Sequence, residues 1–175
     1  MVQRRVMVLA AVVALGAAAF GVPGASGAEE PREAGPLLKK EPKDAKEVAA
    51  IRGKAKHGEE VVVIGRIGGR QNPWIKGAAA FSIVDRSLKS CDEIPGDTCP
   101  TPWDYCCEAD LAKSTVFVKF VGADGKVVKQ DARKLLKVKE LQTVVIKGTA
   151  QRDKQDNVVI LASGLFLPTD KRAAP

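Results

Sequence analysis

Residues 61–69 read V-V-V-I-G-R-I-G-G, and residues 79–85 read A-A-F-S-I-V-D. Both stretches are rich in β-branched and aromatic residues, and the turn-forming pair Asn72-Pro73 lies between them. This pattern predicts two β-strands joined by a loop. These strands are the first two elements of the predicted domain.

Three further strands are predicted downstream. The third covers 115–121 and ends at Asp124-Gly125, a favoured hairpin pair after which 126–128 can return along it. The last two cover 143–149 and 158–167 and are joined by the polar turn 152–157. Leu135, Leu136 and Leu141 predict a short helical or irregular connection before the fourth strand. We therefore expect an all-β fold, a small five-stranded Greek-key barrel.

The strand sequences support this fold. Gly65 lies mid-strand and Gly148 near a strand end, and glycines at such places often mark the bends of a small barrel. The stretches V-V-I-G-R-I, F-S-I-V-D and V-V-I-K-G-T resemble strands of nucleic-acid-type OB-folds, and the resemblance spans residues 60–168. It implies the OB-fold and, as one alternative function, binding of single-stranded nucleic acid by the barrel face.

The segment from Cys91 to Cys107 carries a second resemblance. It has the spacing C-x7-C-x6-C-C and contains Pro-Gly-Asp and Pro-Trp-Asp-Tyr. With 65–69 and 81–85, it makes the chain similar to a group of exported bacterial OB-fold proteins. That similarity implies no particular activity.

The N-terminus predicts export. Arg4 and Arg5 precede the apolar stretch 6–22, and the small residues Ser26 and Ala28 suit cleavage before Glu29. The alternative is a retained membrane anchor, but the Ala and Gly content of the stretch and the cleavage site behind it favour cleavage. We expect residues 1–28 to be a signal peptide and the mature protein to be periplasmic or secreted, with no stable membrane anchor.

Between the leader and the barrel we expect two segments. Residues 29–43 are rich in proline and charge and predict a flexible linker. Residues 44–58 predict a short amphipathic helix with Asp44 as its N-cap and Glu47 three residues on. The barrel domain then covers 59–168, and residues 169–175 form a polar tail. His57, the one histidine of the chain, is expected to be a solvated residue at the helix end.

Residues 86–110, here called the Cys loop, hold all four cysteines between the second and third predicted strands. Two basic and six acidic residues give this loop a charge of −4. The mature chain has 26 basic and 21 acidic residues, a net charge of +5, so the rest carries +9. A long insert of this kind in a small domain is commonly functional or cross-linked.

Two chemistries are open to Cys91, Cys99, Cys106 and Cys107. In an exported protein, disulfides are the expected state, and they would join Cys91 and Cys99 to Cys106 and Cys107 in either order. A Cys106–Cys107 bond is disfavoured because adjacent Cα atoms lie about 3.8 Å apart, below the usual minimum of about 4.4 Å. The alternative is a zinc, iron or copper site made by the four thiolates, although the spacing lacks paired C-x(2–4)-C motifs.

The sequence does not predict an enzyme. A single histidine in the lead-in helix makes no Ser-His-Asp or Cys-His arrangement, and no phosphate-binding glycine motif is present. We expect a binding or structural module with no cofactor, acting on an unknown protein, polymer or small ligand outside the cytoplasm. Nucleic acid is disfavoured because only 5% of residues are aromatic. Candidate ligand-face residues are Trp103, Tyr105, Phe117, Lys119 and Arg66, although Trp103 and Tyr105 are more commonly packing residues in such a setting.

Overall fold

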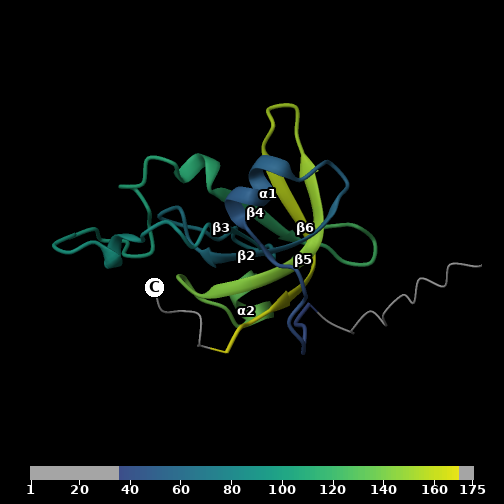
Figure 1. Ribbon diagram of the computed structural model, residues 1–175. Helices are drawn as coiled ribbons and strands as arrows, with labels where there is room; N and C mark the ends of the chain where they lie inside the picture. Colours follow the sequence, from purple (N-terminus) through teal and green to yellow (C-terminus); the bar gives the residue numbers. More distant parts are fainter. Residues whose placement is uncertain (1–35, 170–175) are drawn as a thin grey trace, which may run out of the picture. The chain divides into compact units, whose positions relative to one another are not determined.

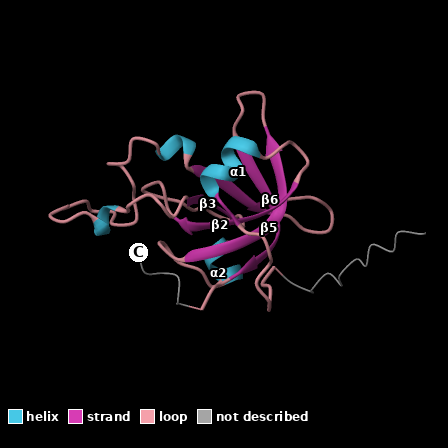
Figure 2. Ribbon diagram, viewed as in Figure 1, coloured by secondary structure: helices cyan, strands magenta, loops and turns pink. Residues whose placement is uncertain are grey.

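The structure is a computed structural model that describes residues 36–169. The predicted signal peptide, linker residues 29–35 and tail residues 170–175 lie outside the described residues. Within the described residues, six strands, two α-helices and two short 3-10 helices follow one another (Figures 1 and 2). In chain order they are β1 (Lys46–Glu47), α1 (Val48–Lys54), β2 (Glu60–Ile67), β3 (Ala80–Val84), η1 (Cys91–Glu93), η2 (Leu111–Lys113), β4 (Thr115–Phe120), α2 (Ala132–Leu136), β5 (Thr143–Arg152) and β6 (Val158–Phe166).

Strands β2 to β6 close into the predicted five-stranded barrel. β2 pairs antiparallel with β3 at one end and with β5 over 60–66. β3 pairs with β4, β4 runs parallel to β6, and β6 returns antiparallel to β5. The ring therefore has no open seam between its first and last strands, and the prediction of a small OB-fold-like barrel is confirmed.

Strand β4 shows the expected alternation. Val116, Val118 and Phe120 are buried, whereas Thr115, Phe117 and Lys119 are partly exposed. The interior face joins a core cluster to which α1 contributes Val48 and Ile51 and α2 contributes Ala132 and Leu136. The two helices thus cover the barrel interior on different sides (Figure 2).

A bulge at Gly148 bends β5. The pairing of β5 with β6 shifts register between Lys147 and Gly148. A Cβ at Gly148 would collide with the backbone of Leu161 and Ala162, so the two strands approach too closely there for any side chain. The sequence-based expectation that Gly148 marks a bend is confirmed.

The lead-in helix is shorter than predicted. α1 begins at Val48 rather than after Asp44, and Glu47 makes no side-chain cap. Lys46 and Glu47 instead pair as β1 with Val63 and Ile64 of β2. The predicted helix 44–58 with its Asp44 cap is therefore wrong at both ends, because strand pairing with β2 takes the residues before Val48.

Part of the predicted linker is ordered against the barrel. Leu37 bridges to Leu165 of β6, and the Leu38 N–H donates to the Leu165 carbonyl at 2.7 Å. The flexible-linker expectation is therefore wrong for residues 36–38. The hairpin after β4 is as predicted, since Val121 bridges to Val127 around Gly125. Within residues 36–169, no helix is long and apolar enough to cross a membrane.

Candidate metal centre in the Cys loop

The Cys loop leaves the barrel between β3 and β4 and projects from it (Figure 1). Two backbone hydrogen bonds fold its start against its end. The Cys91 N–H donates to the Asp104 carbonyl at 2.9 Å, and the Asp92 N–H donates to the Pro102 carbonyl at 3.1 Å. This pairing brings η1 beside residues 104–106, so cysteines far apart in sequence become neighbours.

Arg66 of β2 anchors the first part of the loop. Its guanidinium pairs with the Glu93 carboxylate at 2.8 Å and donates to the Leu88 carbonyl at 2.9 Å. Glu93 also accepts from the Ser90 N–H at 2.8 Å. Partial burial raises the pKa of the Glu93 carboxyl, but Arg66 and Ser90 lower it by more, and the net pKa is below its ordinary value. Arg66 is therefore committed to holding the loop, which does not fit its predicted place on a ligand face.

Tyr105 anchors the second part of the loop. Its side chain is fully buried and packs with Val84 and Leu88 in a small second core. Gly68 lies under the ring, where a Cβ would come within 2.8 Å of the Tyr105 Cε2 atom. The Tyr105 hydroxyl has no hydrogen-bond partner among the described residues, and burial raises its pKa to about 12. Tyr105 is a packing residue and offers no surface to a ligand, so its candidacy for the ligand face is wrong.

Trp103 is half-buried beside this second core. Its Nε1 donates to the Gln71 carbonyl at 2.9 Å, which ties the loop to the β2–β3 connection. Phe117 and Lys119 lie elsewhere, on the outer face of β4, with the Lys119 Nζ 5.8 Å from the Phe117 ring centroid. The structure thus does not bring the five candidate ligand-face residues together in one site.

Three cysteine sulfurs converge at the middle of the loop. The Sγ atoms of Cys91, Cys99 and Cys106, here called the thiol cluster, all lie within 4.8 Å of one another. The Cys91 and Cys106 sulfurs are 3.6 Å apart. Cys107 stands beside the cluster, with its sulfur 4.0 Å from that of Cys106. All four residues are present as thiols.

The cluster spans a gradient of exposure. Cys91 is buried, Cys99 is partly buried, and Cys106 is exposed. Burial, with the thiol of Cys106 adding to it, raises the pKa of the Cys91 thiol. The Thr101 hydroxyl, 3.5 Å from the Cys99 sulfur, lowers the pKa of the Cys99 thiol. The cluster therefore has a buried side at Cys91 and a side open to solvent at Cys106.

The spacing of the sulfurs suits one ion. For sulfurs 3.6–4.8 Å apart, an ion equidistant from all three would lie about 2.1–2.8 Å from each, and thiolate sulfur binds Zn²⁺ at about 2.3 Å. The sequence alone left open paired disulfides or a site made by all four thiolates. It could not show that three of them meet, because the contact depends on the fold of the loop around Arg66 and Tyr105.

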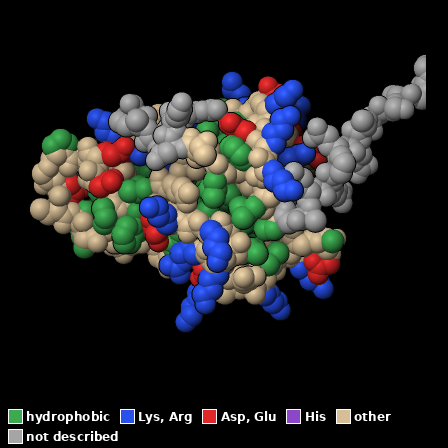
Figure 3. Space-filling view, turned by 90° about the horizontal axis from the view of Figure 1, so that it is seen from below, with side chains coloured by type: hydrophobic (Ala, Val, Ile, Leu, Met, Phe, Trp, Pro, Cys, Tyr) green, Lys and Arg blue, Asp and Glu red, His purple; other side chains and the backbone are tan. Residues whose placement is uncertain are grey.

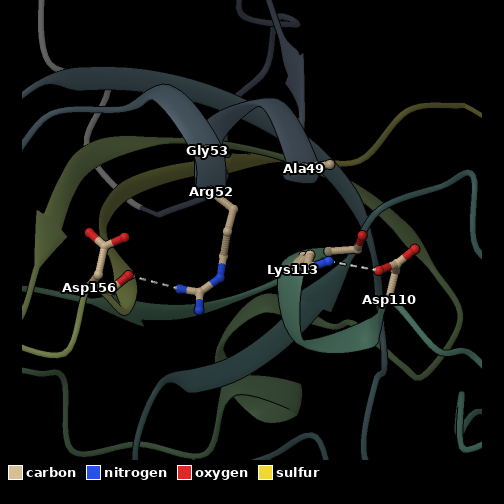
Figure 4. Close-up of a pocket in the computed structure, with 7 residues that line it drawn as sticks. Ala49, Arg52, Gly53, Asp110, Lys113 and Asp156 are labelled. Carbon is tan, nitrogen blue, oxygen red and sulfur yellow. Dashed lines mark hydrogen bonds and ion pairs between the residues drawn. The ribbon is translucent and has the colours of Figure 1, made fainter.

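Among the described residues, a hollow of about 510 Å³ lies away from the thiol cluster, between α1, η2 and the β5–β6 turn (Figure 4). Its charged groups are engaged with neighbouring protein atoms. Arg52 donates to the carbonyls of Ala112 and Asp156, and Lys113 pairs with Asp110 at 3.3 Å. Asp156 also accepts from Arg152 at 2.6 Å. These contacts make the hollow a solvated junction rather than a prepared ligand site.

His57 is exposed at the end of the segment after α1, and its Nδ1 lies 3.2 Å from the Arg152 carbonyl oxygen. This position matches the solvated role expected from the sequence.

No protein-family model matches the chain, and no curated protein matches it. Among solved structures, the chain is similar to OBody AM1L10 bound to hen egg-white lysozyme, at 17% identity over 74% of this chain and 95% of that one, with a TM-score of 0.40. It is also similar to OBody AM3L15 bound to hen egg-white lysozyme, at 16% identity over 77% and 96% of the two chains, with a TM-score of 0.41.

Proposed function

We propose that this protein is an exported, non-catalytic OB-fold module whose Cys loop binds one soft metal ion through thiolates. The observation that carries the proposal is the convergence of the Cys91, Cys99 and Cys106 sulfurs within 4.8 Å. Thiolates are soft ligands that select Zn²⁺, Cu(I) or iron over hard cations. A disulfide joins two sulfurs, whereas three sulfurs that converge on one point can all bind the same ion.

The surroundings support a formed site. The loop is fixed to the barrel by Arg66 and by the buried ring of Tyr105, so the cysteine positions do not depend on a bound ion alone. Pre-positioned ligands lower the entropy cost of binding. The signal peptide predicted at residues 1–28 supports export, and the single histidine of the sequence, which makes no Ser-His-Asp or Cys-His arrangement, supports a non-catalytic role.

A disulfide between Cys91 and Cys106 is the second candidate. The observation in its favour is their 3.6 Å sulfur separation, which a small loop movement would reduce to the bond length of about 2.05 Å. An oxidising compartment favours this product. It would leave Cys99 and Cys107 to pair after further rearrangement or to stay as thiols.

Intact mass measurement distinguishes the two candidates. Full-length protein is secreted from a bacterial host, and its mass is recorded under native and denaturing conditions, with and without thiol alkylation. The proposed function expects a native mass heavier by one metal ion and four alkylated cysteines after denaturation without reductant. The disulfide candidate expects equal masses and fewer alkylated cysteines. Metal-free protein with four reactive thiols, which binds no added metal, would overturn both.

A further inference from the structure

We infer that the ion is Cu(I), held by the three sulfurs of the thiol cluster, with Cys107 outside the ligand set. This inference rests on the proposed metal-binding function and specifies which metal the site takes. It depends on the number of donors the loop supplies, their hardness, and the exposure of the site.

The cluster supplies three ligands, all of them sulfur. Among residues 36–169, no histidine or carboxylate joins Cys91, Cys99 and Cys106 in the group. Nearby carboxylates are engaged elsewhere, since Glu93 pairs with Arg66 and Asp97 accepts from the Cys99 N–H at 2.8 Å. Within the described residues, the cluster therefore has no histidine or carboxylate positioned to complete a mixed ligand set.

Three thiolates fit Cu(I) better than Zn²⁺ or iron. Structural zinc is almost always four-coordinate, and iron–sulfur clusters are generally held by four protein ligands. Cu(I) is soft, monovalent and without a d-electron geometric preference, and a planar set of three thiolates satisfies it. A three-sulfur site holds zinc with one position left to solvent, which makes zinc the more easily removed ion.

Cys107 is poorly placed to be a fourth ligand. Its sulfur is 4.0 Å from that of Cys106, but it lies outside the group of three that share one centre. Cys106 and Cys107 are adjacent in the chain, and both are exposed. The Cys106 and Cys107 sulfurs are close enough to share an ion, but Cys107 is outside the group in which every pair of sulfurs lies within 4.8 Å, so it would have to move relative to the other sulfurs to join them.

The exposure gradient makes the site exchangeable. Cys91 is buried, whereas Cys106 is exposed to solvent. An ion bound here can be reached from one side by another thiol without unfolding the domain. Closed structural zinc sites lack this access.

The test uses the reduced full-length protein without oxygen. It is titrated with Cu(I) in competition with bicinchoninate, and separately with Zn²⁺ in competition with a chromogenic zinc chelator. We expect one Cu(I) per chain, three sulfur neighbours by copper X-ray absorption, and zinc that the chelator removes readily.

Four matched variants identify the ligands. Cys91→Ser, Cys99→Ser and Cys106→Ser should each weaken Cu(I) binding by at least about tenfold, because even the loss of a residue that only orients a metal ligand costs about 10–100-fold in affinity. Cys107→Ser should leave Cu(I) affinity and the three-sulfur signature unchanged. Far-UV circular dichroism of each variant checks that the barrel stays folded.

Two results would overturn the copper inference and leave the proposed function standing. One is zinc that resists the chelator, and the other is a loss in Cys107→Ser equal to that in Cys91→Ser. Either would point to a four-thiolate zinc site. If the reduced protein bound neither metal, the proposed function would fail as well.

Discussion

Asp85, at the end of β3, shows how much one residue contributes to joining the helix to the barrel. Its carboxylate accepts from the Ala49 N–H in the first turn of α1 at 2.7 Å and from the Ser87 hydroxyl at 2.7 Å. The first turn of a helix has N–H groups without partners in the helix, and a carboxylate satisfies them well. Burial raises the pKa of Asp85, but these hydrogen bonds lower it by more, and the net pKa is below its ordinary value.

Asp85→Asn should destabilise the fold in a pH-dependent way. At pH 7 we expect a loss of about 1–3 kcal/mol, because an amide cannot accept at both oxygen positions. Since the folded pKa is lowered, the ionised form stabilises the protein above the unfolded pKa of about 3.9, and this contribution is lost as pH falls through the folded value. Thermal unfolding from pH 7 to pH 2.5 should show the two proteins converging below about pH 4.

The control for this comparison is Asp124→Asn, in the exposed β4 hairpin, where Asp124 pairs with Lys126 at 3.8 Å. It should leave both stability and its pH dependence nearly unchanged. A constant gap between wild type and Asp85→Asn down to pH 2.5 would contradict the role given to the carboxylate.

Tyr105→Phe should not destabilise the protein, although the side chain is fully buried. The hydroxyl makes no hydrogen bond of good geometry within the described residues, and the effect of the Ser90 side chain on its pKa is outweighed by burial. Removing the hydroxyl therefore relieves the cost of burying a polar group. We expect an unchanged or higher melting temperature by calorimetry. Tyr105→Ala is the contrast, with an expected loss of about 3–5 kcal/mol from the cavity. A clear loss of stability in Tyr105→Phe would show that the hydroxyl is hydrogen-bonded.

Among the elements, the contact of β2 with the Cys loop decides where the cysteines lie. Arg66 reaches from β2 to Glu93 in η1 and to the Leu88 carbonyl. The contact has side-chain exposures of 18% and 27%, so solvent screens it less than a fully exposed pair. It is the polar link between a barrel strand and the segment that carries Cys91.

Arg66→Gln should loosen the start of the loop. We expect a loss of about 1–3 kcal/mol in stability, because charge-assisted hydrogen bonds to Glu93 and to the backbone are removed. Hydrogen exchange should speed up in residues 88–93 and stay unchanged in β5 and β6. Lys126→Gln, which removes an exposed ion pair with Asp124, should do neither. Exchange in 88–93 that stays at the wild-type rate would show that Arg66 is not the anchor.

At the scale of the whole molecule, the barrel and the Cys loop have separate cores. The large cluster fills the barrel and includes α1 and α2, whereas Val84, Leu88 and Tyr105 form a small second cluster under the loop. Charge is divided as well. Seen from the side of α2, Lys and Arg side chains spread over the barrel face, and several Asp and Glu side chains lie on the projecting part (Figure 3). The loop is therefore an attachment whose state can change without rebuilding the barrel.

Metal removal should affect the loop and spare the barrel. If the proposed site is occupied, a chelator with reductant should leave the far-UV circular dichroism of the barrel unchanged and make residues 94–107 sensitive to protease. The free energy of unfolding should fall by the binding contribution, about 2.7 kcal/mol for a metal at 100 times its dissociation constant, and the melting temperature should fall with it. Global unfolding on chelation would contradict the independence of the two cores.

The sequence by itself determined the barrel. Three local signals predicted parts of it: the alternation in β4, the turn at Asp124-Gly125 and the bend at Gly148. The structure has all three, because strand pattern and turn chemistry act over a few residues. The sequence also showed that all four cysteines lie in one loop, and it limited their chemistry to disulfides or a metal site.

Only the tertiary structure decided which groups meet. The partner of the α1 N-terminus is Asp85, 36 residues away, and not the nearby Asp44. Likewise, Cys91, Cys99 and Cys106 come together because Arg66 and Tyr105 fix both arms of the loop to the barrel. Contacts between distant segments depend on packing and chain closure. A sequence pattern reports only local preference, so it does not show these contacts.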